Sequence, residues 1–211
     1  MTAMESPRFV GLLFLSILSV LVFSACARER EAAVFHPGDD TASAFRSTKC
    51  PEKMVYIDEA RVCMDMFEYP NATGESPMSG VKWEEAAELC GKQGKRLPTL
   101  EEWEAACMGE KGRIYPYGEE YDKGKCRVDL LPGAGPAPSG SNKKCHTPEG
   151  VFDLCGNLWE WTSTEGFEKN TYYVKGGSWS SFPSVAACEF KAWEPPDGGG
   201  PDYGFRCVVK P

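Results

Sequence analysis

Ten cysteines in a chain of 211 residues constrain the fold more than any other feature of this sequence. An apolar run from Phe9 to Phe23, preceded by Arg8, is typical of a signal peptide and is short for a membrane span. A chain exported in this way matures where disulfides persist. Nine cysteines follow Cys26, and an odd number leaves at least one thiol unpaired or joined to another molecule. The sequence therefore predicts a cross-linked, loop-rich domain of the cell envelope.

The end of this leader predicts a lipid anchor. Ser24 and Ala25 are small residues directly before Cys26, as in a bacterial lipobox, where cleavage precedes the cysteine and its thiol carries a lipid. We expect a signal peptide over 1–25 and attachment to the membrane through Cys26; ordinary secretion with an incidental Cys26 is the alternative. Because Ala27 is not an aspartate, the retention pattern of enteric bacteria indicates an outer-membrane location facing the periplasm.

The remaining chain divides into a tether and one domain. Residues 26–49 mix charged and small residues without a sustained period, which is typical of a flexible tether, and residues 50–211 are enough for one core. The leader contains one acid and one base, so its removal leaves the net charge at -8. An acidic domain of this kind lacks the excess of positive charge that attracts nucleic acid, so we expect no nucleic-acid partner.

Hydrophobic periodicity predicts two helices in this domain. The first has one apolar face and Gly91 placed to end it, and the second begins after Thr99, which forms a capping box with Glu102. The apolar positions are Trp83, Ala86, Ala87 and Cys90 in the first helix, and Leu100, Trp103 and Cys107 in the second. Each helix therefore points one cysteine toward the core.

Short apolar runs predict strands, and the richest Pro, Gly and Ser region predicts a long ordered loop over 115–147. The expected strands are Met54–Ile57, Arg61–Met66, Leu158–Thr162, Tyr172–Lys175 and Phe205–Val209. In the last of these, alternation places Phe205, Cys207 and Val209 on one face.

Several sequence blocks recur in one order and together resemble the formylglycine-generating enzyme, or sulfatase-modifying-factor, family. The blocks are Gly94 to Thr99 with Glu102, Trp103 and Glu104; Tyr115 to Gly118; Gly150 to Thr162, including Gly156, Asn157, Leu158, Trp159, Glu160 and Trp161; Lys175 to Trp179; and Gly204 to Cys207. The resemblance covers about Met54 to Val209. It implies an α+β, C-type-lectin-like fold that is irregular and disulfide-linked, with a twisted antiparallel sheet and two flanking helices.

The resemblance also implies two disulfides, Cys90 with Cys207 and Cys107 with Cys188. Each closes a long loop and contributes roughly 3 to 5 kcal/mol in the chain-entropy model. We expect Cys50 with Cys63 and Cys126 with Cys145 as local pairs, which leaves Cys155 as the odd thiol; other pairings of these five cysteines stay open. Nothing basic adjoins Cys155 to lower its pKa, so an inert buried thiol is favoured over a redox residue.

Members of this family hold a calcium ion beneath the Gly-Asn-x-Trp-Glu-Trp strand. The matching ligands here are the carboxylates of Asp153 and Glu160 and the backbone carbonyls of Gly156 and Leu158. A hard cation prefers several oxygens from a flexible segment, which this turn supplies. The alternative is that Asp153 caps a turn and Glu160 pairs with a nearby base. The resemblance does not extend to a second calcium site, where Arg127 stands in place of an asparagine.

Copper is not expected, although the family's oxidases depend on it. Their copper is held by two thiolates, since soft sulfur ligands select copper(I), and here Ser180 to Ala187 contains no cysteine. Cys188, next in the chain, is committed to a disulfide by the resemblance. Only His36 and His146 occur, which excludes a three-histidine site, and a Ser-His-Asp triad could use only His146 with Ser178. We expect His146, in a loop beside Cys145, to be exposed or structural.

Three functions remain compatible with these residues. The first is an anchored domain that lacks copper-dependent cysteine oxidation and binds a peptide or other envelope ligand in the former substrate groove. Ser178 and Trp179 are its groove candidates, and of the six tryptophans Trp179 and Trp193 are expected to be exposed there. The second is a divergent periplasmic enzyme of the family, either formylglycine-generating or similar to the branch that acts in siderophore maturation. The third is a purely structural lipoprotein.

Overall fold

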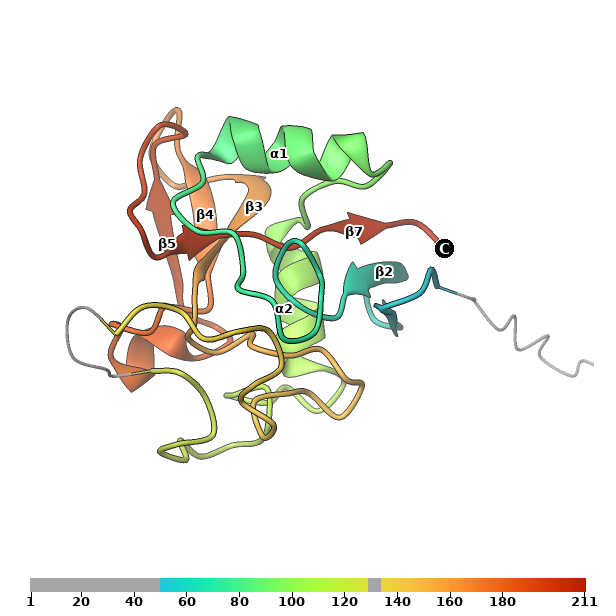
Figure 1. The fold of residues 1–211 in the computed structure, drawn as a ribbon, viewed down its shortest axis with the longest axis vertical. Coiled ribbons are helices and arrows are strands. Elements are labelled where there is room, and N and C mark those ends of the chain that lie inside the picture. Colours follow the sequence, from blue (N-terminus) through green and yellow to red (C-terminus); the bar gives the residue numbers. More distant parts are fainter. Residues whose placement is uncertain (1–49, 129–133) are drawn as a thin grey trace, which may run out of the picture. The chain divides into compact units, whose positions relative to one another are not determined.

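The structure is a computed structural model that describes residues 50–128 and 134–211 (Figure 1). The expected leader, the tether and Cys26 lie outside the described residues. In chain order the elements are β1 (Met54–Ile57), β2 (Val62–Asp65), α1 (Trp83–Lys92), α2 (Leu100–Met108), β3 (Trp159–Glu165), β4 (Tyr172–Lys175), the 3-10 helix η1 (Pro183–Ala186), β5 (Lys191–Glu194), β6 (Tyr203–Gly204) and β7 (Val208–Val209). No helix among these residues is long and apolar enough to cross a membrane.

The strands form two small sheets. The first is antiparallel with the order β1-β2-β7, and the second has the order β5-β4-β3-β6, with β6 running parallel to β3. In the second sheet Glu160 of β3 lies opposite Lys175 of β4, and Trp161 lies opposite Val174. Because side chains alternate along a strand, these two pairs point to opposite faces of the sheet.

Each face of the four-stranded sheet is covered by one helix. On one face Trp161 and Val174 form a core cluster with Ala86 and Cys90 of α1. On the other, Trp103 of α2 donates from its Nε1 to Glu160 over 2.7 Å, and Glu104 of α2 accepts from Lys175 over 2.9 Å. The two helices therefore hold the same strands from opposite sides.

The structure contains the expected disulfides: Cys50–Cys63, Cys90–Cys207, Cys107–Cys188 and Cys126–Cys145. Cys155 is the free cysteine of the described residues and is buried. The pair at Cys90 ties α1 to the segment before β7, and the pair at Cys107 ties α2 to the segment after η1. Local pattern and the family resemblance thus predicted the cross-links correctly.

The predicted secondary structure agrees with most elements. The capping box of Thr99 and Glu102 opens α2, β1 and β4 have the expected bounds, and the described parts of 115–147 contain no helix or strand. The strands β2 and β3 lie where they were expected, but β2 is one residue shorter at each end and β3 starts one residue later and extends to Glu165. Two further predictions need a correction. The helix α1 continues past Gly91 to Lys92, because Gly94, not Gly91, has the positive φ of 69° that reverses the chain.

The strand expected over Phe205–Val209 is also wrong. Only Val208 and Val209 are in a strand there, β7, and Tyr203 and Gly204 form β6 in the other sheet. Residues 205–207 connect the two sheets and are buried on all sides, so Arg206 is as deeply buried as Phe205 and Cys207. Alternation predicts one buried face, and it fails where a segment crosses the core between two sheets.

Candidate functional site

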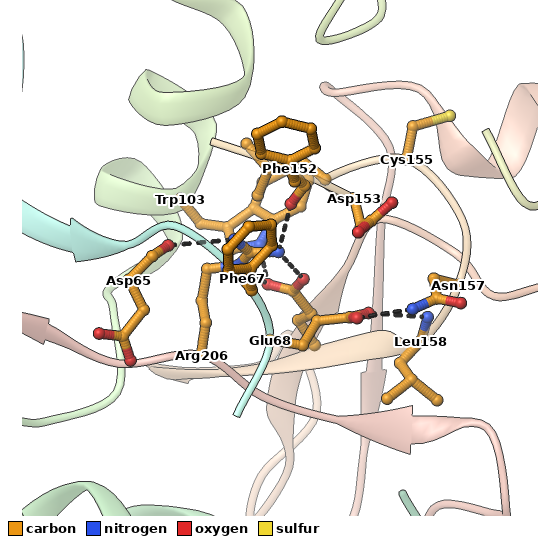
Figure 2. A network of polar contacts seen from close by, with 12 residues as sticks. Asp65, Phe67, Glu68, Trp103, Phe152, Asp153, Cys155, Asn157, Leu158 and Arg206 are labelled. Atoms are coloured by element: carbon orange, nitrogen blue, oxygen red, sulfur yellow. Dashed lines mark hydrogen bonds and ion pairs between the residues drawn. The ribbon is translucent and has the colours of Figure 1, made fainter. Parts of the chain in front are cut away.

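A buried ion pair joins Arg206 and Glu160. Figure 2 shows Arg206 among the polar contacts that surround it. The Arg206 guanidinium donates to both Glu160 oxygens, from Nη2 over 2.6 Å and from Nε over 2.7 Å. It also donates to the backbone carbonyls of Asp65, Met66 and Phe152. A planar fork of five N–H donors suits this task. Arg206 therefore joins the end of β2, the 150–154 loop and β3.

Two further carboxyl groups are buried beside this ion pair. Glu68 accepts from the side-chain amide of Asn157 over 2.6 Å and from the backbone N–H of Leu158 over 3.2 Å. Burial, with added repulsion from Asp153 and Glu160, raises the pKa of Glu68 well above its ordinary value. Burial likewise raises the pKa of Asp153 to about 6. The cluster thus holds three carboxyl groups against one guanidinium.

Asp153 has an unused oxygen in this cluster. Its Oδ2 accepts from the backbone N–H of Gly140 over 3.3 Å, but its Oδ1 is buried without a hydrogen-bond partner. Glu160 Oε2 accepts from both Trp103 and Arg206, whereas its Oε1 accepts from Arg206 only. Since a carboxylate has about four acceptor sites, Glu160 retains capacity for another ligand. Asp153 Oδ1 is thus the free oxygen among the expected calcium ligands, whereas Glu160 is paired with a base, which is the alternative given above. No group of three or more His, Cys, Asp or Glu in the described chain could hold a metal ion.

The backbone between these carboxylates is tightly fixed. Gly156 has a φ of 75°, and a Cβ there would lie 2.2 Å from the carbonyl oxygen of Arg127. Asn157 has a φ of 63°, and its side chain holds both Glu68 and the backbone of Ala137. Gly156 is required because no side chain fits that approach. The Gly-Asn pair thus sets the turn that brings Asp153 and Glu160 into one cluster.

The groove candidates are not exposed. Ser178 is 0% and Trp179 is 8% exposed, so the expectation that Trp179 lies open in a groove is wrong. Ser178 turns inward because its hydroxyl donates to Asp202 over 2.8 Å and its backbone N–H donates to the Ser181 hydroxyl. Trp193, at 38%, is exposed as expected. Phe182, four residues after Ser178, is 72% exposed.

The cysteines of the described residues are four disulfides and one buried thiol. Cys188 follows the cysteine-free window and is bonded to Cys107. Burial raises the pKa of the Cys155 thiol to about 12, so the free cysteine of residues 50–128 and 134–211 is a protonated thiol. His146 points its Nδ1 at the carbonyl of Thr147 over 2.8 Å, and Ser178 is bonded to Asp202 instead. These residues do not form a nucleophilic triad.

Sequence reasoning missed the contribution of Glu68. A glutamate between short strands is normally exposed, and no spacing in the sequence links it to Asn157, which lies 89 residues further on. Asp202, the partner of Ser178, was missed for the same reason, because it lies in a Gly- and Pro-rich loop that reads as exposed. Glu68 and Asp202 contact their partners because segments far apart in the sequence pack together in the fold.

Two small sheets, two flanking helices and disulfides that bind the helices to the last segments define a C-type-lectin-like domain. This chain belongs to the sulfatase-modifying-factor family: residues 40–211 match the domain described as "Sulfatase-modifying factor enzyme 1-like domain". It is 32% identical over 153 residues to the "Inactive C-alpha-formylglycine-generating enzyme 2" of Bos taurus, covering 64% of this chain and 50% of the relative.

The same family includes an active relative. The "Formylglycine-generating enzyme" of Mus musculus is 28% identical over 166 residues, covering 63% of this chain and 44% of the enzyme. The chain thus spans about half the length of the curated relatives it matches or less. Among solved structures, PvdO from Pseudomonas aeruginosa aligns with a TM-score of 0.57 and 17% identity over 70% of this chain and 79% of PvdO. That likeness shows the fold.

Proposed function

We propose that this chain is an exported, lipid-anchored member of the family that lacks copper-dependent cysteine oxidation and binds a peptide or other envelope ligand. The supporting observation is the chemistry of its sulfur atoms. Ser180 to Ala187 contains no cysteine, Cys188 is in a disulfide, and Cys155 is buried with its pKa raised to about 12. Copper(I) needs soft thiolate ligands, and none of these positions offers one.

The similarity to a relative named as inactive supports the same proposal. That relative is somewhat more similar to this chain, at 32% identity, than the active mouse enzyme at 28%. The scaffold residues nevertheless remain: Arg206 and Glu160 are paired and the cross-links are formed. A domain that retains its scaffold without the metal ligands is suited to binding rather than oxidation.

Two measurements test the absence of oxidation. The purified protein is titrated with copper(I) and is incubated with a cysteine-containing sulfatase peptide, while the mouse formylglycine-generating enzyme serves as the positive control. We expect no stoichiometric copper binding and no aldehyde in the peptide, because no pair of thiolates is available. Tight copper binding together with aldehyde formation would overturn the proposal.

A divergent periplasmic enzyme is the second candidate. It is favoured by the Ser178–Asp202 hydrogen bond of 2.8 Å, which holds a polar group beneath the surface near Ser180. Such an enzyme could resemble the siderophore-maturation branch or use another chemistry on a peptide. If extracts of the periplasm are altered by the wild-type protein but not by Ser178→Ala and Asp202→Asn, catalysis replaces binding as the function.

The anchor and location are proposals from the leader sequence. Cleavage before Cys26 and lipidation of its thiol would attach the domain to the outer membrane, facing the periplasm. Incorporation of labelled palmitate and sedimentation with outer-membrane vesicles measure both steps. The variant Cys26→Ala should lose the label and become soluble, while Cys155→Ala, which removes the other free thiol, should keep it.

We also propose a structural calcium ion at the Asp153 and Glu160 carboxylates, with the carbonyls of Gly156 and Leu158. It is supported by the partnerless Asp153 Oδ1 and by the excess of buried carboxyl groups over guanidinium, since a divalent cation neutralises charges that burial disfavours. When bound, the ion would stabilise the turn and take no part in a reaction. Calcium should raise the melting temperature of the chelated protein and leave Asp153→Asn unchanged; equal melting with calcium and chelator would contradict it.

A further inference from the structure

Strand β5 lies at an open edge of the four-stranded sheet. It pairs on one side with β4, in the register Tyr173 opposite Trp193, and within the described chain no strand or loop pairs with its other side. Figure 1 shows β5 at the outer margin of that sheet. In an edge strand, the N–H and C=O groups of alternate residues point outward. These groups are available to an added strand.

Three rings, two of them exposed and one half-buried, lie beside this edge. We call Phe167, Tyr173 and Trp193 the aromatic platform. The ring of Phe167, which is 81% exposed, lies 5.8 Å from that of Trp193, and the Tyr173 ring lies 6.4 Å from Trp193 at 89°. Gly166 fits closely against the Cβ of Trp193, so the turn between β3 and β4 is held against β5. The ring contacts of the platform are therefore present without a ligand.

The platform already accommodates a cation. The ammonium of Lys191, on β5, lies over the Tyr173 ring at 5.7 Å from its centroid. An aromatic face attracts such a charge, and tryptophan attracts it most strongly. The Trp193 and Phe167 rings have no cation over them in the described chain. The contact at Tyr173 therefore indicates that the rings of Trp193 and Phe167 can also bind a cation.

Carboxylates slightly outnumber lysines in the segments that carry the platform. Exposed carboxylates flank it along the chain at Glu165, Glu168 and Glu189, against the lysines Lys169 and Lys191. The whole chain carries a net charge of -8. Complementary charge attracts basic partners and disfavours the anionic surface of a membrane.

From this arrangement we propose that β5 and the aromatic platform form a docking surface for an extended peptide rich in lysine or arginine. The peptide adds a strand to the β5 edge, and its basic side chains lie over Trp193 and Phe167. Backbone pairing supplies affinity in such complexes, and alternate side chains supply specificity. This inference deepens the proposed function by naming the chemistry of the ligand, and it moves binding away from the buried Ser178.

The test uses the full chain and a fluorescein-labelled peptide in which valine and lysine alternate over six residues. Binding is measured by fluorescence anisotropy, and hydrogen exchange is followed at residues 190–194. We expect saturable binding that weakens with salt, and slower exchange in β5. Trp193→Ala should raise the Kd about tenfold or more, as for an aromatic anchor at an interface. Lys191→Gln should tighten binding, because it removes a positive charge of β5 that repels a basic peptide.

Matched controls separate strand addition from attraction of charge alone. Phe182→Ala removes another exposed ring, 72% exposed, that lies outside the platform, and should leave the Kd unchanged. A peptide with glutamate in place of lysine should not bind, and one N-methylated along one edge should bind far more weakly. The proposal is overturned if the lysine peptide does not bind, if Trp193→Ala binds it normally, or if N-methylation has no effect.

The remaining outcomes distinguish this inference from the function on which it rests. Peptide binding that is insensitive to Trp193 contradicts the docking surface and leaves a binding function in place. Copper uptake with aldehyde formation contradicts the proposed function and leaves the peptide result standing. If phosphatidylglycerol vesicles bind through Trp193 and the peptide does not, the surface contacts membrane and the peptide assignment is wrong.

Discussion

One face of the four-stranded sheet is built in two different ways along its length. Beneath α2, the face consists of Glu160 and Lys175, both buried, with charges paired to Arg206 and Glu104. Beyond α2, the same face continues as Tyr173 and Trp193, where the contacts are between rings and one end is open to water. Tyr173 and Lys175 belong to the same strand, two residues apart, so the two regions share a backbone and differ in what covers them.

This difference separates the part of the domain that holds the fold from the part that can change. Removing one partner of a buried ion pair leaves an uncompensated charge and is strongly destabilising. Removing an exposed ring leaves no buried polar group or charge without a partner. We therefore expect the covered region to maintain the fold. Substitutions in the open region should change ligand binding with little effect on folding. Each of the following predictions tests that separation.

The largest effect is expected for Arg206→Met. The substitution removes the donors to both oxygens of Glu160, leaving three buried carboxyl groups without a guanidinium. We expect the free energy of unfolding to fall by about 3 to 5 kcal/mol. Urea denaturation monitored by tryptophan fluorescence measures it. Lys92→Met, which breaks the exposed pair with Glu88, is the control and should have no measurable effect; similar values for the two variants would remove the basis of the comparison.

Lys175 provides a pH-dependent test of the covered region. Burial, partly offset by Glu104, lowers the pKa of Lys175 from 10.5 to about 8. Between these values the unfolded chain binds more protons than the folded one, so the stability of the wild type should rise with pH relative to Lys175→Met. The expected gain from pH 8 to 10.5 is roughly 3 kcal/mol. Its exposed cross-strand partner offers the control, since Lys191→Met should follow the wild type; parallel curves for all three proteins would show that Lys175 is not desolvated.

The covered region was more predictable from sequence than the open one. The helix α2 has a capping box and an apolar period, and the cysteine pairs followed from the resemblance or from short spacing, so these features could be placed before the structure was known. Asp153 and Glu160 were identified through the family motif. Arg206, the partner of Glu160, was known only as part of a block, because a buried arginine cannot be recognised from alternation.

The open region gave no comparable signal. Strand β5 is four residues long and alternates lysine, alanine, tryptophan and glutamate next to prolines, which resembles a loop. Trp193 was expected to be exposed, but Phe167 and Tyr173 were not linked to it, because the platform forms only when the β3–β4 turn folds against β5. The prediction that Ser178 and Trp179 line an open groove was wrong, because Asp202 accepts a hydrogen bond from Ser178 and holds that segment inward.

A smaller effect is expected at the start of α2, which bounds the covered region. The Thr99 hydroxyl accepts from the backbone N–H of Glu102 and the Glu102 carboxylate accepts from the backbone N–H of Thr99. Thr99→Ala should therefore reduce the free energy of unfolding by about 1 kcal/mol. Thr99→Ser keeps the cap and should retain most of that stability. Equal losses in both variants would indicate that the methyl group, and not the cap, contributes at this position.

The smallest effect on folding is expected at the open region, for Phe167→Ala. The Phe167 ring is 81% exposed and so contributes little buried apolar surface to the fold. Its removal should therefore change the free energy of unfolding by no more than about 0.5 kcal/mol. The same variant should weaken binding of the lysine peptide, measured by anisotropy. A large loss of stability would mean that the aromatic platform stabilises the sheet. The separation between the covered region and the open region would then be wrong. Loss of binding without loss of stability is the combination that a ligand surface requires.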